Sequence, residues 1–333
     1  MRCPICGETD PAAALGDPCP ICDGVLVDPA TAPDRFIGRR VDGFAIVGRL
    51  GAGGHGAVYR ALHGPRRAVA ALKLIPLDDD PRRRDRFARE VAALRALADA
   101  AGPPLVGAGE ARIDGRAWLY LARVHVAGTP LSAVLAEHRR LPPDAARDIT
   151  HGVLTRLAAA HAHGVVHRDL KPAHVLLTAA DGRRRVDLLD FGIARIRAAD
   201  DPGGALATLT TTGAVVGTPA YTAPEQIDAR APIGPATDLY AVGVMLHEML
   251  TGARPFDGLD ALAVLRAHLD RPPPPLEGPL APVVARALAK HPADRWPSAD
   301  AMRRALRPRR ARRAALAVAA AAGLALAALA LAR

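Results

Sequence analysis

The sequence predicts an α+β fold of two unequal lobes, a small strand-rich lobe followed by a larger helical one. Between residues 44 and 75, short apolar runs alternate with turn residues, a pattern typical of strands. From residue 144 onward most apolar residues recur at the spacing of one helix face. The chain has 333 residues and half of them are hydrophobic, so both lobes can bury a core.

The expected elements are, in chain order, strands at 44–50, 57–62 and 68–75, a helix at 82–97, apolar runs at 105–110 and 118–126, a helix at 144–164, short strands near 175–178 and 186–189, and helices at 236–251, 260–269, 282–289 and 298–306. A helix is expected at 82–97 because Phe87, Val91, Leu94 and Leu97 recur on one side at helical spacing. A Thr/Gly-rich stretch from 198 to 218 separates the short strands from the later helices.

The charge distribution argues against a general nucleic-acid binder. The formal charge is +10 at pH 7, but residues 303–333 contain eight arginines and no acidic residue. The rest of the chain therefore carries a net charge of only +2. A near-neutral body with a basic tail lacks the broad positive surface that nucleic-acid binding requires. No nucleic-acid partner is expected.

All four cysteines fall within the first 22 residues, as Cys3-x-x-Cys6 and Cys19-x-x-Cys22. The N-terminus lacks the apolar stretch of a secretory signal peptide, so we expect a reducing cytoplasm, where paired thiols are metal ligands rather than disulfides. Two such turns supply four thiolates to a tetrahedral Zn²⁺, with Fe²⁺ in a rubredoxin-like site as the rival and unligated thiols as the simplest alternative. Residues 1–27 are thus predicted to form a zinc-ribbon-like module, followed by a linker at 28–43.

A Gly-rich sequence, Gly51-x-Gly53-x-x-Gly56-x-Val58, lies between the first two expected strands. Glycines allow a tight turn and bring backbone N–H donors close to phosphate oxygens. Dinucleotide-binding folds share this spacing, but there a helix follows the glycines, whereas here a strand follows. The sequence therefore favours a loop that covers nucleotide phosphates over a dinucleotide site, while this motif on its own fits a plain hairpin turn equally well.

Further motifs follow at regular positions: Val69-Ala70-Ala71-Leu72-Lys73, Glu90 on the next helix, His167-Arg168-Asp169-Leu170-Lys171-Pro172, Asp190-Phe191-Gly192 and Ala223-Pro224-Glu225. With these motifs in this order, residues 44–306 resemble the eukaryotic-like Ser/Thr protein kinases of bacteria. The resemblance implies a two-lobed protein-kinase-like fold with ATP bound between the lobes.

The resemblance also implies roles for individual residues. Asp169 would accept or orient the proton of the substrate hydroxyl, and Lys171 would neutralise charge on the transferred phosphoryl group. Lys73 would hold the α- and β-phosphates and pair with Glu90. The residues implied to surround ATP are Leu50, Gly51, Ala52, Gly53, Gly54, His55, Gly56, Val58, Ala71, Lys73 and Leu176.

Other roles implied by the resemblance concern the metal and the framework. Asp190 would hold Mg²⁺ at the phosphates. Asp238 would anchor the backbone of the catalytic loop, and Glu225 would pair with Arg295. Thr218, in Gly-Thr-Pro-Ala-Tyr, matches the substrate-side loop of kinases that modify Ser or Thr rather than Tyr.

Two residues depart from the family pattern. His174 replaces a metal-binding Asn, and an imidazole nitrogen suits softer ions such as Mn²⁺ better than Mg²⁺. Arg123 falls where an apolar residue usually lines the adenine pocket, unless the alignment slips by one residue. A charge there needs a partner, such as Glu90 or Asp190, or access to solvent. These departures keep open the alternative of a pseudokinase scaffold.

The tail predicts a membrane anchor. Residues 314–332 are 19 uncharged, Ala-rich and Leu-containing residues behind the arginines of 307–313. As a helix they rise about 28 Å, close to the hydrocarbon thickness of a bilayer. They are apolar on every face, whereas a soluble helix docked on the kinase, the alternative, should have a polar one. The arginines predict a kinase that faces the cytoplasm, on the cytoplasmic membrane of a bacterium.

The expected function is that of an ATP-dependent protein Ser/Thr kinase acting on protein substrates. Its cofactors would be ATP, Mg²⁺ or Mn²⁺, and Zn²⁺. Resemblance to related bacterial kinases indicates activating autophosphorylation in trans at Thr210 or Thr212, which requires two copies to meet. A Thr run that is only a flexible polar loop is the simpler alternative.

Overall fold

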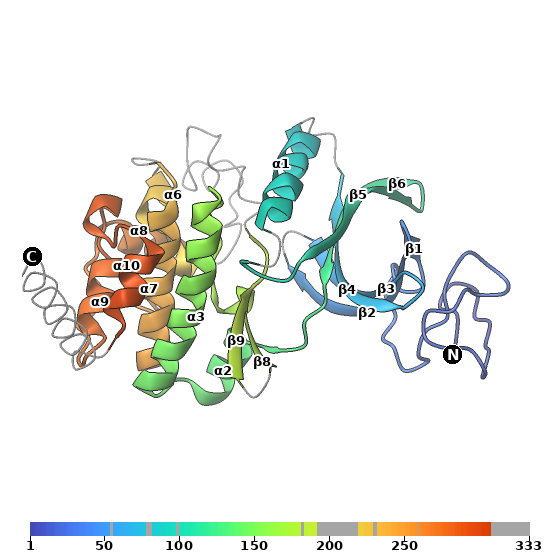
Figure 1. Ribbon diagram of the computed structural model, residues 1–333, viewed down its shortest axis with the longest axis horizontal. Helices are drawn as coiled ribbons and strands as arrows, with labels where there is room; N and C mark the ends of the chain where they lie inside the picture. Colours follow the sequence, from blue (N-terminus) through green and yellow to red (C-terminus); the bar gives the residue numbers. More distant parts are fainter. Residues whose placement is uncertain are drawn as a thin grey trace, which may run out of the picture.

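The first lobe of the computed structural model is built on a six-stranded antiparallel sheet (Figure 1). Its strands are β1 (Arg40–Val41), β2 (Phe44–Gly53), β3 (Gly56–His63), β4 (Ala68–Pro76), β5 (Leu105–Ile113) and β6 (Arg116–Val124), in the order β1-β2-β3-β4-β6-β5. Helix α1 (Arg82–Leu97) follows β4 and lies beside the sheet. The predicted strands and the helix at 82–97 are confirmed.

The structure describes residues 1–53, 56–77, 82–97, 100–180, 183–191, 219–228, 232–258 and 260–307. Several predicted features lie outside these ranges: Gly54, His55, Thr210, Thr212, Thr218, the basic segment after residue 307, and the segment 314–332. Among the described residues, no helix has both the length and the apolar character that a membrane span needs.

Strand register gives the sheet two chemically different faces. Lys73 on β4 lies opposite Val58 on β3 and Leu121 on β6, so these side chains share one face. Ala71 and its partner Arg123 share it too, since residues two apart on a strand point the same way. This face carries the residues predicted to contact ATP.

The opposite face is covered by the chain that precedes the sheet. Val25, Val27, Phe36, Ile37 and Val41 form one buried core with residues of that face, which are Tyr59, Ala61, Ala70, Leu72, Leu74, Tyr120 and Ala122. The sequence predicts a linker at 28–43, but part of it is packed against the sheet. Its apolar residues bury area that an extended linker would leave in water.

The second lobe combines a small sheet with helices. The sheet contains β7 (Thr129–Pro130), β8 (Val175–Ala180) and β9 (Arg183–Leu188). The helices are α2 (Leu131–His138), α3 (Pro143–Ala162), α6 (Pro224–Asp228), α7 (Pro235–Thr251), α8 (Ala261–Asp270), α9 (Ala281–Ala287) and α10 (Ala299–Ala305), with 3₁₀ turns η1 (Pro172–His174), η3 (Pro219–Tyr221) and η4 (Pro292–Asp294). The five helices predicted for this lobe are confirmed as α3, α7, α8, α9 and α10, with ends that differ by at most two residues.

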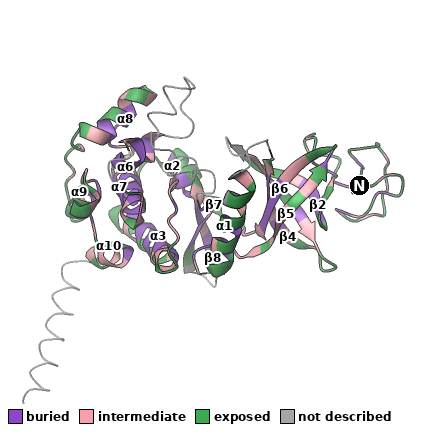
Figure 2. Cartoon of the chain, turned by 90° about the horizontal axis from the view of Figure 1, so that it is seen from above, coloured by how far each residue is buried: buried purple, intermediate pink, exposed green. Residues whose placement is uncertain are grey.

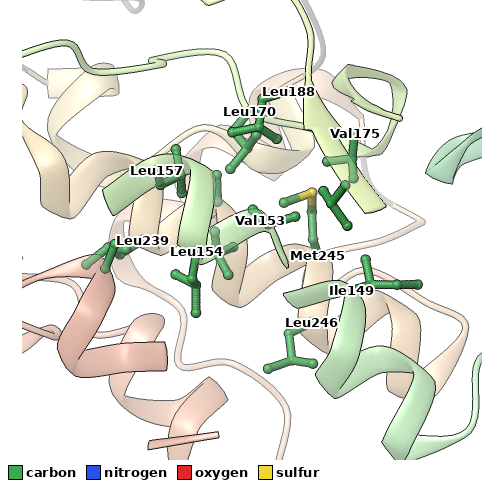
Figure 3. Packing of buried hydrophobic residues seen from close by; sticks show 14 of the residues in the cluster. Ile149, Val153, Leu154, Leu157, Leu170, Val175, Leu188, Leu239, Met245 and Leu246 are labelled. Carbon is green, nitrogen blue, oxygen red and sulfur yellow. The ribbon is translucent and has the colours of Figure 1, made fainter. Parts of the chain in front are cut away.

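Helices α3 and α7 form the centre of this lobe. Helix α7 is buried along most of its length, as its purple colour in Figure 2 shows. Figure 3 shows Val153 and Leu157 of α3 packed with Met245 of α7, beside Leu170 and Leu188. Since Leu170 is next to Asp169 and Leu188 ends β9, this core fixes the two segments that carry the predicted catalytic and metal-binding carboxylates. The predicted two-lobed α+β arrangement is confirmed.

Candidate active site

The catalytic loop is held by a buried carboxylate at the start of α7. Asp238 is 1% exposed and accepts hydrogen bonds from the backbone N–H groups of His167 and Arg168, both at 2.8 Å. Arg168 has φ of 65°, an uncommon value for a residue with a side chain, so the loop needs this support. The predicted anchoring role of Asp238 is confirmed.

Two supporting residues of this loop were not predicted. His161 of α3 places Nε2 2.8 Å from Asp238, and Gln226 of α6 donates to the carbonyl oxygen of Arg168 at 2.7 Å. Gln226 is 7% exposed, which is unusual for its type and indicates a structural hydrogen bond. Its position directly after the Ala-Pro-Glu motif was the signal available in the sequence.

The predicted catalytic carboxylate and its lysine lie together. Lys171 Nζ donates to Asp169 Oδ2 at 2.9 Å, and both side chains are mostly buried. A carboxylate beside a cation stays ionised, as required of a group that accepts or orients a hydroxyl proton. The same lysine brings a positive charge to the place where a phosphoryl group would be transferred.

His174 is fixed by the loop that it follows. Its Nδ1 lies 2.7 Å from the carbonyl oxygen of Asp169, so the neutral ring carries its proton there and keeps a lone pair on Nε2. Burial lowers the pKa of His174 to about 4, so the ring is neutral at physiological pH. Asp190 opposes this shift through its charge, which places the two groups near each other. A neutral imidazole and a carboxylate are together a donor set that fits a divalent cation.

Lys73 forms an ion pair with Asp190 rather than with Glu90. Its Nζ lies 3.3 Å from Asp190 Oδ2. Burial alone would raise the pKa of Asp190, but nearby positive charges, of which Lys73 is the strongest, act together with a hydrogen bond from that lysine to hold the pKa below its usual value. A lysine and an ionised aspartate at this distance fit the phosphates and the metal of a nucleotide respectively.

Glu90 is buried without a hydrogen-bond partner for either carboxylate oxygen among the described residues. Burial raises its pKa to about 9, although the nearby Lys73 acts in the opposite direction. The predicted pairing of Lys73 with Glu90 is therefore not formed in this structure. The physical reason is competition, because Asp190 already occupies the lysine.

Arg123 is half-buried on the face of the sheet that carries Lys73. Its Nε donates to the carbonyl oxygen of Pro103 at 2.7 Å. Burial lowers the pKa of Arg123, and the nearby carboxylates of Asp190 and Glu90 oppose the shift. The guanidinium thus donates to a carbonyl oxygen and lies near two carboxylates, which compensate the buried positive charge.

The remaining predicted ATP contacts lie along β2, β3, β4 and β8. Leu50 is an exposed residue of β2, and Gly51 would carry a Cβ into open space. Gly56 has φ of +122°, and a Cβ there would lie 2.3 Å from the carbonyl oxygen of Leu74. This close approach explains the glycine. Ala52 and Gly53 end β2, while Leu176 is buried on β8.

The four cysteines come together in a second site. Their Sγ atoms all lie within 4.8 Å of one another, with Cys3–Cys22 at 3.6 Å and Cys6–Cys19 at 3.5 Å. Zn–S bonds of about 2.3 Å in a tetrahedron place sulfur atoms about 3.8 Å apart. The cluster therefore has the dimensions of a four-thiolate metal site.

A buried ion pair stabilises the helical lobe. Arg295 donates from Nη1 and Nη2 to the two carboxylate oxygens of Glu225, each at 2.8 Å, and neither side chain is more than 1% exposed. Thr237 of α7 also donates to Glu225 at 2.7 Å. The pairing that the sequence predicted is confirmed, and it links α6 to the start of α7.

Comparison with known proteins is consistent with this geometry. The family pattern described as the protein kinase domain matches residues 44–303. The Ser/Thr-protein kinase PkaA of Streptomyces coelicolor is 41% identical over 274 residues, which are 78% of this chain and 48% of PkaA. Pkn1 of Myxococcus xanthus, also a Ser/Thr-protein kinase, is 37% identical over 324 residues, 91% of this chain and 43% of Pkn1.

The chain thus spans about half the length of the curated relatives that it matches. Among solved structures, the PknI kinase domain of Mycobacterium tuberculosis matches with a TM-score of 0.59 and 28% identity. That match covers 81% of this chain and 97% of the PknI chain. With the family pattern present over most of its length, and the catalytic loop and lysine placed as described, this chain belongs to the protein kinase family.

Proposed function

We propose that this chain is an ATP-dependent protein Ser/Thr kinase. The observation that carries the proposal is a pair of carboxylate–lysine contacts, Asp169 with Lys171 at 2.9 Å and Asp190 with Lys73 at 3.3 Å. Nδ1 of His174 lies 3.7 Å from Oδ2 of Asp169, and the charge of Asp190 also acts on this ring. The Ser/Thr preference is supported by the relatives that bear that name and by Lys171 beside Asp169.

Each residue has one task in this proposal. Bound ATP supplies the γ-phosphoryl group, and a divalent cation reduces the negative charge on it. Asp169 orients the substrate hydroxyl and takes its proton. Lys171 stabilises the charge on the phosphoryl oxygens during transfer, while Lys73 holds the other phosphates. Asp190 and Nε2 of His174 are the groups that would hold the cation.

The direct test is transfer of labelled γ-phosphate to the protein itself or to a generic basic protein, with Mg²⁺ and Mn²⁺ compared. We expect transfer by the wild type that favours Mn²⁺, and none by Asp169→Asn. His174→Asn should shift the preference toward Mg²⁺, because an amide oxygen suits the harder ion. Intact ATP binding without transfer under either metal would instead support the pseudokinase scaffold.

We also propose regulation by autophosphorylation in trans at Thr210 or Thr212. A phosphate on these residues would add about two negative charges, and Arg168, next to Asp169 in the sequence, is the cation that we propose binds it. Mass spectrometry of active protein should find phosphate between residues 206 and 216, and none in Asp169→Asn. Full activity of a Thr210→Ala, Thr212→Ala variant would refute this switch.

For the cysteine cluster we propose Zn²⁺ as the bound ion. Its support is the 4.8 Å limit on all Sγ separations and the two CPxC turns. Metal analysis of purified protein should find one zinc per chain, and much less in Cys6→Ser. Stoichiometric iron with a thiolate charge-transfer colour would assign the rubredoxin-like alternative instead.

For the tail we propose a single membrane span at 314–332 that tethers the kinase to the cytoplasmic face of a bacterial membrane. The support is in the sequence: an uncharged segment of sufficient length that follows a cluster of arginines. Full-length protein should enter the membrane fraction and require detergent, whereas a chain without 314–333 should be soluble. Full-length protein that is soluble without detergent would contradict the proposal.

A further inference from the structure

The end of the cysteine module packs into the hydrophobic core of the nucleotide-binding lobe. Val25 and Val27, which follow the second cysteine pair, are at most 4% exposed and belong to the same buried cluster as Ile46 and Tyr59 of the sheet. Figure 1 shows the N-terminal chain folded beside β1 and β3. Cys3, Cys19 and Leu26 form a small cluster of their own. Because Val25 and Val27, on either side of Leu26, are buried in the core of the sheet instead, the module is packed onto the lobe rather than held on a flexible arm.

Backbone hydrogen bonds continue from the metal-binding turns into the sheet. Arg2 and Val27 exchange two bonds at 2.8 Å, and the N–H of Val25 donates to Gly38 at 2.7 Å. Gly38 in turn donates to Ile46 of β2 at 2.9 Å. A short path of main-chain contacts therefore runs from the residue before Cys3 to β2, the strand that leads into the Gly-rich sequence.

The packing along this path is close. A Cβ on Gly38, which has φ of +88°, would lie 2.4 Å from Cγ of Pro4, the residue after Cys3. A Cβ on Gly24 would lie 3.2 Å both from Sγ of Cys3 and from the carbonyl oxygen of Gly38. A metal-binding sulfur and the segment that supports β2 are thus separated by one glycine.

Polar contacts fix the same interface at its edges. Asp34 accepts a hydrogen bond from Tyr59 of β3 at 3.1 Å and pairs with Arg49 of β2 at 3.3 Å. Asp17, between the two cysteine pairs, forms an ion pair with Arg67 in the turn from β3 to β4 at 2.9 Å. Asp34 thus holds side chains of the two strands that flank the Gly-rich sequence, and Asp17 holds the turn that follows β3.

We propose that the four-cysteine module is a metal-dependent brace of the nucleotide-binding lobe, so that metal binding sets the affinity for ATP. One face of the sheet carries Lys73 and Val58, and the other rests on residues 25–41. A metal held by the four cysteines would crosslink the chain directly before this covering segment. Loss of the metal, by chelation or thiol oxidation, loosens this cover and the strands that present the Gly-rich sequence. This inference rests on the proposed ATP binding for one of its two readouts.

The experiment uses the full chain, loaded with Zn²⁺ and then stripped by a chelator. Affinity for a fluorescent ADP analogue and hydrogen exchange of the amides of β2 and β3 are measured in both states. We expect at least tenfold weaker nucleotide binding and faster exchange on stripping, with both restored by added Zn²⁺. Restoration separates loss of the brace from irreversible misfolding.

Two variants distinguish bracing from a merely local metal site. Tyr59→Phe with Arg67→Met leaves all four cysteines in place but removes polar contacts of the interface. It should retain zinc and bind the nucleotide analogue roughly three- to tenfold more weakly than the wild type. The matched control Ile21→Ser, at a side chain 68% exposed on the module, should leave zinc content and nucleotide affinity unchanged.

The proposal is overturned if the stripped protein keeps wild-type exchange rates in β2 and β3. It is also overturned if the stripped protein binds the nucleotide analogue as tightly as the loaded one. A loaded protein that binds no nucleotide at all refutes the proposed kinase function instead. In that case the exchange measurement still decides whether the module braces the lobe.

Discussion

Charge competition around one lysine determines the state of the site at the scale of single residues. Lys73 pairs with Asp190 at 3.3 Å and leaves Glu90 buried without a partner among the described residues. The sequence predicted all three residues as members of the site. It could not predict which carboxylate takes the lysine, since that depends on the position of α1 and of the segment after β9, and a motif specifies neither.

The unpaired Glu90 gives a pH-dependent prediction. Its pKa in the folded chain is about 9, above the ordinary value of 4.5, so the contribution of Glu90 to stability is greatest below pH 4.5 and is lost as pH rises toward 9. At pH 7 the lost free energy of unfolding is about 3 kcal/mol. Glu90→Gln removes this titration. The difference in Tm between Glu90→Gln and the wild type, both measured without nucleotide, should increase by roughly 5–10 °C in favour of the variant as pH rises from 5 to 8.

Thermal unfolding followed by circular dichroism at four pH values is sufficient to test this prediction. Glu137→Gln, at an exposed side chain of α2, is the control and should follow the wild type at every pH. A constant Tm difference between Glu90→Gln and the wild type would show that Glu90 is ionised in the folded protein. Kinase activity of Glu90→Gln should fall despite the higher Tm, because a neutral amide cannot pair with Lys73 when ATP binds.

At the scale of elements, the periodic spacing of apolar residues predicted most of the helices. The helix predicted at 82–97 and the five helices predicted for the second lobe are present in the structure, with small changes at their ends. Helix α2 was missed although Leu131 and Leu135 are buried at helical spacing, because Pro130 directly before it suggests a turn. The packed part of 28–43 was missed because Pro29, Thr31 and Pro33 suggest a linker. The adjacent Phe36 and Ile37 were the signal of burial.

The start of β3 allows a prediction about the Gly-rich hairpin. At Gly56 a Cβ would lie 2.3 Å from the carbonyl oxygen of Leu74, and the backbone has φ of +122°. Gly56→Ala must therefore move β3 away from β4 near Lys73, at a cost on the order of 1–3 kcal/mol. We expect an increase of at least tenfold in KM for ATP and a smaller change in kcat. Gly115→Ala, also at positive φ but with open space around its Cβ, is the control for backbone strain alone. Equal kinetics for Gly56→Ala and the wild type would show that this approach is not needed for nucleotide binding.

At the scale of the whole molecule, buried histidines join separate segments of the second lobe. His167 is fully buried and lies 4.8 Å from the ring of Phe191, between the catalytic loop and the end of β9. His268 of α8 is equally buried and bonds to Tyr240 of α7 and to the carbonyl oxygen of Ala220. Each ring fills its site as a neutral group, so protonation must disturb the packing around it.

Two buried histidines, His174 and His268, predict a loss of stability in mild acid. Burial lowers the pKa of His174 and of His268 to about 4, and Lys290 adds to the shift at His268. The imidazoles take up protons below about pH 6.5 in the unfolded chain but stay neutral in the folded one. The stabilising contribution of the two neutral rings is therefore fully present above pH 6.5 and is lost as pH drops toward 4. Each group contributes about 3 kcal/mol to the loss at pH 4.

His174→Asn removes one of these groups, so the Tm of this variant should fall less steeply than that of the wild type between pH 7 and pH 4.5. His138→Gln, at an exposed side chain, should follow the wild type. Parallel curves for His174→Asn and the wild type would mean that His174 is charged in the folded protein, and the neutral ring with a free Nε2 lone pair would then be wrong.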